Sequence, residues 1–178
     1  MSAKDRLESI LSESRIRAMR TFFAQVPVVC FTESTQRGLE YMIGEAGFEP
    51  WGIVFHREAV FAQGGGPVFH LRGDEWEARE SLPLRLQSRF IKFAEGEAEW
   101  TEEREWRVPY EEGEAGFEFH PDEVEAVIVG DTDWPHPEPD MELALVLGET
   151  AAQMYEGPPT WFHGYSRWWW NGERLDYL

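Results

Sequence analysis

The stretch EREWRVP at residues 103–109 constrains the fold most, because charged and apolar residues alternate along it. Successive side chains of an extended chain point to opposite faces of a sheet, so this pattern predicts a β-strand. Glu103, Glu105 and Arg107 are expected on one face, with the residues between them on the other. A face with two carboxylates and a guanidinium lies either on a solvated edge strand or on the floor of a polar cleft. Both interpretations stay open at this point.

The chain length of 178 residues predicts one domain that folds without disulfide bonds. Apolar residues make up 42% of the chain and aromatic residues 15%, which suffices for a core and leaves rings for a binding surface. Cys30 is the only cysteine, which excludes a disulfide within one chain, and its apolar neighbours predict a buried thiol that packs as a small hydrophobe. The sequence shows no signal-peptide pattern and no membrane-length apolar run, so a cytoplasmic location is expected.

The net charge of −18 argues against non-specific adhesion to nucleic acid or anionic lipid, because both are repelled at long range. Nucleic acid is therefore expected only as a specific substrate. Thirteen carboxylates fall within residues 95–125, beside Arg104 and Arg107. Such a run is typical of a solvated face, and it also suits a surface that mimics DNA or docks a basic protein partner.

Residue periodicity predicts a succession of short helices and strands. Helical spacing of apolar residues predicts a helix at 4–14, followed by a turn or a second short helix. A continuous β-branched run at 26–31 predicts a strand buried on both faces. Helical pieces are expected at 75–93, divided by Pro83. The other predicted elements are strands at 51–56, 67–71, 117–119 and 125–130, and helices at 35–42, 57–61 and 140–155.

This order predicts an α+β fold: a single domain over residues 1–178, with a central mixed β-sheet, continuous or split, and short flanking helices. Residues 156–178 form an aromatic-rich C-terminal extension that contains three consecutive tryptophans at 168–170. A strand cannot bury three successive rings against one face, because neighbours point oppositely. The remaining ring surface is expected to meet another element, a second copy in a homodimer, or stacked bases.

Carboxylates are the side chains in this sequence that are the best candidates for a catalytic role. The five histidines lack the close spacing that places two imidazoles on one face, so no metal site is predicted. Glu103 and Glu105 lie two residues apart on the predicted strand, near enough for each to affect the other's charge. Arg107 would hold one of them in its ionised form.

Four motifs in this order resemble the AbiGi family of abortive phage-resistance proteins: VPVVCF at 26–31, GIVF at 52–55, PVF at 67–69 and EREWR at 103–107. The resemblance covers residues 5–130, and EREWR is its distinctive part. A more distant similarity extends to DarT-like ADP-ribosyltransferases. It rests on the Ile10-Leu11 pair in the first helix and on a strand with the pattern Glu-aromatic-x-Val, which matches Glu105 with the catalytic glutamate of that family.

The resemblance implies a split-sheet fold of the ADP-ribosyltransferase type, with NAD as cofactor, and a role in abortive infection, toxin–antitoxin systems or another phage–host conflict. It implies Glu105, with Glu103 and Arg107 beside it, as the catalytic group. Such transferases contact NAD through a His or Arg on a strand ahead of the first helix. No strand is predicted there, so either Arg15 or Arg17 supplies this contact or the NAD site has decayed.

Cleavage of a nicotinamide–ribose bond needs a carboxylate beside an oxocarbenium-like centre and aromatic rings around the base. Phe31, Trp51 and Trp106 are the candidate rings, and Thr32 stands at the polar end of the first buried strand. The same rings also suit an ordinary core. Two functions therefore compete: an NAD-dependent ADP-ribosyltransferase that modifies a nucleic acid or protein, and a catalytically silent antitoxin or inhibitor that docks a partner through its acidic surface.

Overall fold

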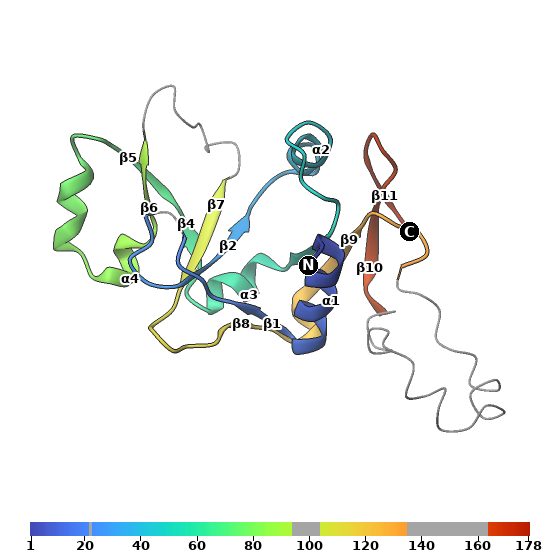
Figure 1. Cartoon of the computed structure of the whole chain (residues 1–178), viewed down its shortest axis with the longest axis horizontal. Helices are drawn as coiled ribbons and strands as arrows, with labels where there is room; N and C mark the ends of the chain where they lie inside the picture. The colour runs from blue at the N-terminus through green and yellow to red at the C-terminus, as the bar shows by residue number, and fades with distance from the viewer. Residues whose placement is uncertain (22, 94–103, 135–163) are drawn as a thin grey trace.

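The computed structural model describes residues 1–21, 23–93, 104–134 and 164–178. Short helices and small β-sheets alternate through them, so the fold is mixed α/β (Figure 1). The helices are α1 (Ala3–Glu13), α2 (Gln36–Gly44), α3 (Arg57–Ala62), α4 (Leu84–Gln87) and the 3-10 helices η1 (Trp76–Ser81) and η3 (Pro121–Glu123). The strands are β1 (Arg15–Arg17), β2 (Val28–Thr32), β3 (Gly52–Phe55), β4 (Gly66–Pro67), β5 (Phe69–Arg72), β6 (Phe90–Phe93), β7 (Glu105–Pro109), β8 (Gly116–Glu118), β9 (Val124–Val129), β10 (Ser166–Trp170) and β11 (Leu175–Tyr177).

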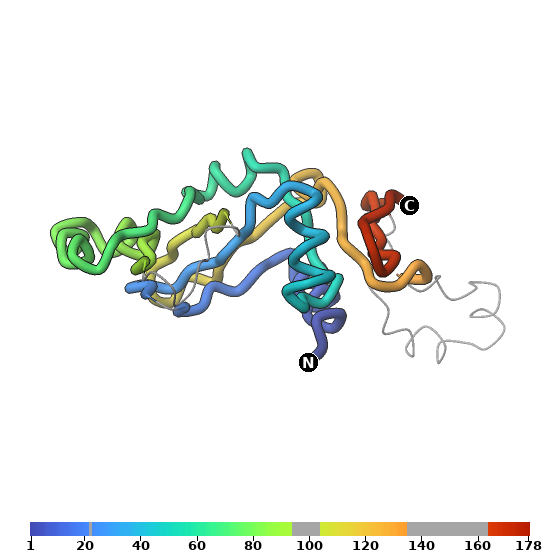
Figure 2. Tube along the Cα trace, turned by 90° about the horizontal axis from the view of Figure 1, so that it is seen from above, coloured from blue at the N-terminus to red at the C-terminus, as the bar shows by residue number. Residues whose placement is uncertain are grey.

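The elements form an elongated arrangement. Strands β5 and β6 lie with α4 at one end, the β10–β11 hairpin lies at the other, and α1 and α2 lie between them (Figures 1 and 2). None of the helices among the described residues is long and apolar enough to cross a membrane.

Strand β7 is the centre of a three-stranded antiparallel sheet with the order β2-β7-β4. The alternation along EREWRVP produces the predicted two faces over the described part of this stretch. Trp106 and Val108 are 9% and 0% exposed and belong to the hydrophobic core. Glu105 and Arg107 lie on the opposite face, where Arg107 stands across from Cys30 on β2. The strand prediction is confirmed from Glu105 onward.

A second sheet has the order β11-β10-β9-β3. Its strand β9, predicted as buried, is confirmed: four of its six residues in succession, Ala126 to Val129, are buried. Strand β9 pairs in parallel with β10 and antiparallel with β3, which leaves β3 at the sheet edge. The predicted central sheet is therefore divided, with β2 and β7 in one sheet and β3 and β9 in another.

Helix α1 packs into a core that it shares with the two larger sheets. Helix α1 begins at a capping box in which Ser2 Oγ accepts from the Asp5 amide, and it buries Leu7 and Leu11 on one side. Phe117 is fully buried, and its ring centroid lies 5.0 Å from that of Phe31 and 5.2 Å from that of Phe55. These edge-to-face contacts join β8 to one edge strand of each larger sheet.

Three segments differ from the sequence prediction, and in each the difference comes from pairing with a distant segment. Residues 15–17 form β1 against β8 in place of a turn or short helix. Residues 90–93 do not end a helix but form β6 in parallel with β5. The predicted strand at 67–71 is divided, because the Val68 amide donates to Glu105 O and the next amide, of Phe69, donates to Arg89 O. The chain thereby passes from one sheet to another.

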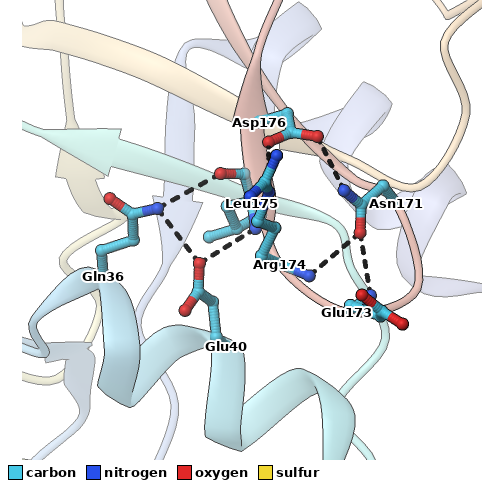
Figure 3. A network of polar contacts seen from close by, with 7 residues as sticks. All are labelled: Gln36, Glu40, Asn171, Glu173, Arg174, Leu175 and Asp176. Carbon is cyan, nitrogen blue, oxygen red and sulfur yellow. Dashed lines mark hydrogen bonds and ion pairs between the residues drawn. The ribbon is translucent and has the colours of Figure 1, made fainter.

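The β10–β11 hairpin is fastened to α2 by a polar network (Figure 3). Gln36 Nε2 donates to Leu175 O (3.2 Å), and the Leu175 amide donates to Glu40 Oε1 (3.1 Å). The three tryptophans of β10 are all partly buried: Trp168 meets Tyr177, Trp169 packs on the core, and Trp170 lies against Gly44. Elements of the same chain therefore cover much of their surface. The helix predicted at 140–155 lies outside the described residues.

Candidate functional site

Glu105 and Arg107 form a nearly buried ion pair. Arg107 donates from Nε to Glu105 Oε1 (2.7 Å) and from Nη2 to Oε2 (3.3 Å), and its Nη1 donates to Ser88 O (2.9 Å). The side chains of Arg107 and Glu105 are only 4% and 13% exposed. A two-point contact of this kind fixes the plane of the carboxylate. The interpretation that this pair lies on a solvated edge strand is therefore wrong.

Glu103, the second candidate carboxylate, lies outside the described residues. Its neighbour Arg104 has a left-handed backbone (φ 46°) immediately before β7 begins. Its side chain reaches Glu33, which follows β2 directly. The end of β2 therefore lies beside the start of β7, with opposite charges in contact.

Glu33 accepts hydrogen bonds from three groups, one at the start of α3 and two at the start of β7. Arg57 Nη1 donates to Oε1 (3.1 Å), while Arg104 Nη2 and Trp106 Nε1 both donate to Oε2 (3.2 Å each). The Arg57 guanidinium carbon also lies 5.7 Å from the centroid of the Trp106 ring. Sequence reasoning missed Glu33, because a polar residue after a strand usually marks only the end of that strand. The carboxylate directly after CFT was the available signal.

Two hollows meet at this cluster. The smaller, of about 280 Å³, is lined by Glu33, Pro67, Val68, His70, Arg104, Glu105 and Trp106. His70 Nε2 is buried, and within the described residues it has no hydrogen-bond partner. The larger hollow is a groove of about 820 Å³ that shares Glu33 and Trp106 with the first. A single carboxylate, Glu33, therefore borders both.

The groove follows β2 and β3, which belong to different sheets. Four of the predicted cofactor-binding residues line it: Phe31, Thr32, Trp51 and Trp106. Three of them also pack in or against the core, so the two interpretations of these rings are compatible: each ring supports the fold and walls the groove. The fifth, Arg17, does not line the groove. Its side chain is 74% exposed and pairs with Glu13.

The prediction that Cys30 is buried between two apolar faces is wrong, because β2 is buried on both faces only at its start. Val28 and Val29 are buried, whereas Cys30 and Thr32 are exposed on the side of the Glu105–Arg107 pair. Although the residue is exposed, neighbouring side chains desolvate the thiol. This burial, with the hydrogen bond and the charge of Glu105, raises the pKa of Cys30 to about 12.

Cys30 is therefore expected to react slowly with iodoacetamide. The thiolate is the reactive form, so a pKa about three above the ordinary value lowers the rate at pH 8 by roughly 100- to 1,000-fold. Glu105→Gln removes the negative charge and should speed alkylation, measured by mass spectrometry. Glu118→Gln, at an exposed carboxylate paired with Arg15, is the matched control and should leave the rate unchanged. Equal rates for both variants would show that Glu105 does not act on the thiol.

Comparison of the chain with protein-family models, curated proteins and solved structures gives no match. The resemblance to AbiGi and DarT-like proteins therefore stays a prediction. Among the described residues, no three His, Cys, Asp or Glu side chains are grouped so as to hold a metal ion.

Proposed function

We propose that the chain is an NAD-consuming ADP-ribosyltransferase that modifies a nucleic acid or protein target. The observation that carries this proposal is the groove between the edge strands of two sheets, which borders the hollow of Glu105 at Glu33 and Trp106. Its volume of about 820 Å³ is within the range of ligand pockets, about 300–1,000 Å³. The resemblance to abortive phage-resistance proteins supports a role in phage–host conflict.

The reaction breaks the bond between C1′ of the ribose and the nicotinamide nitrogen, and the electron pair leaves with nicotinamide. Positive charge then develops on the ribose ring, and a nucleophile of the target forms a bond to C1′ and releases its proton. Glu105 supplies a negative charge close to the developing cation, and Arg107 holds that carboxylate in one orientation. The groove rings Phe31, Trp51 and Trp106 provide apolar walls for the bases.

A catalytically silent binding module is the second candidate. It is favoured by the contacts of Glu105, since both carboxylate oxygens already accept hydrogen bonds from Arg107 and the side chain is only 13% exposed. In this case the ion pair is structural, and the acidic surface docks a basic partner, as an antitoxin or inhibitor would.

Incubation with NAD distinguishes the two functions. The protein is incubated with NAD alone, with DNA, with RNA and with cell protein, and free nicotinamide and mass additions of ADP-ribose are measured by mass spectrometry. Calorimetry measures NAD binding in parallel. Nicotinamide release above the protein-free control is expected. Binding without release would favour the silent module, and the absence of both would refute the proposal.

A further inference from the structure

Two guanidinium groups from distant parts of the chain converge on Glu33, at the border of the two hollows. Arg57 starts α3, and Arg104 precedes β7. The Arg57 and Arg104 side chains are 68% and 54% exposed, and Glu33 is 34% exposed, so solvent reaches all three. The cluster has two positive charges and one negative charge. The two guanidinium groups meet here although the chain has a net charge of −18, and the other carboxylates that line the hollows are Glu49, Glu105 and Glu125.

Within the described residues, the two arginines retain most of their hydrogen-bonding capacity. A guanidinium has five N–H donors, and the contacts with Glu33 use one donor of Arg57 and one of Arg104. Ion pairs as exposed as these are individually weak. A ligand with more negative charge and more acceptor oxygens than one carboxylate can therefore compete with Glu33 for both groups.

We propose that Arg57 and Arg104 form a binding site for the diphosphate of a nucleotide, and that Glu33 occupies these arginines when the ligand is absent. The inference rests on the proposed function, since it assigns the charged part of the substrate to a place in the same groove. A diphosphate bound here would leave the aromatic walls beside Phe31 and Trp51 for a base and the hollow of Glu105 for the reacting sugar.

A diphosphate fits this site better than a nucleic acid backbone does. A backbone needs a positively charged track over several phosphates, whereas this chain is strongly acidic and offers two arginines at one place. The position between two hollows also suits a compact ligand with one charged centre and a group at either side.

The test is calorimetric titration with ADP, pyrophosphate and uncharged adenosine at low salt. Arg57→Gln and Arg104→Gln should each weaken ADP and pyrophosphate binding about tenfold and leave adenosine binding unchanged. Glu33→Gln should strengthen ADP binding about three- to tenfold, because it removes the internal competitor. Arg17→Gln is the matched control, since Arg17 is an exposed arginine paired with Glu13 and does not line either hollow. Thermal melts confirm that each variant is folded.

A change in ADP affinity opposite to the one expected for Glu33→Gln would contradict the proposal most directly. If Glu33→Gln weakens ADP binding, Glu33 contacts the ligand and is not a competitor, and the inference fails. It also fails if Arg57→Gln and Arg17→Gln have equal effects, if no phosphate probe binds, or if a short oligonucleotide binds more tightly than ADP. The proposed function is tested separately. ADP binding without nicotinamide release refutes the transferase and keeps the diphosphate site. Nicotinamide release together with an ADP affinity that none of these substitutions alters refutes the diphosphate site and keeps the transferase.

Discussion

Glu105→Gln is expected to lower nicotinamide release from NAD by on the order of 100-fold or more, with NAD affinity changed little. The substitution keeps the shape of the side chain and removes the charge that stabilises the transition state, an interaction made mainly in that state. Steady-state kinetics, with nicotinamide as the measured product, should therefore show a lower kcat and a nearly constant KM.

The Glu105→Gln experiment needs a folding control, because Glu105 is nearly buried against Arg107. The amide is a weaker acceptor for a guanidinium, so a loss of about 1.5–3 kcal/mol in the free energy of unfolding is expected. Activity is therefore compared at a temperature where circular dichroism shows both proteins folded. Glu118→Gln, at a 64% exposed carboxylate, should keep full activity. Wild-type turnover in Glu105→Gln together with loss in Glu103→Gln would move the catalytic role to Glu103.

Local periodicity was enough to predict the elements whose side-chain pattern matches their environment. Strand β7 alternates between core and polar face, β9 is a continuous apolar run, and α1 carries Leu7 and Leu11 on one side. Each of these patterns reports burial directly. The same reasoning brought Glu105 and Arg107 to one face and placed Trp106 on the other.

The elements and contacts that the sequence did not predict depend on pairing between distant segments of the chain. Nothing local in residues 90–93 distinguishes a helix end from a strand, and β6 exists because it pairs with β5, about twenty residues earlier. The site shows the same limit. Glu33 and its partners Arg57 and Arg104 are separated by 24 and 71 residues, so their contact follows only from the sheet order and from the start of α3.

Arg107→Met is expected to have the largest effect on stability, a loss of about 3–5 kcal/mol in the free energy of unfolding. Methionine fills a similar volume, so the loss comes mainly from electrostatics: the nearly buried Glu105 carboxylate and Ser88 O both lose their donors. Urea denaturation should give a lower midpoint with an unchanged slope.

The matched control for this prediction is Arg17→Met, which removes an exposed guanidinium from its contact with Glu13 and should cost less than about 1 kcal/mol. The double variant Glu105→Gln/Arg107→Met removes both charges. It should be more stable than Arg107→Met alone, because no unpaired charge is left nearly buried. If Arg107→Met is no less stable than Arg17→Met, Glu105 is solvated and does not depend on its partner. The carboxylate would then lack the fixed orientation on which its proposed role at the ribose relies.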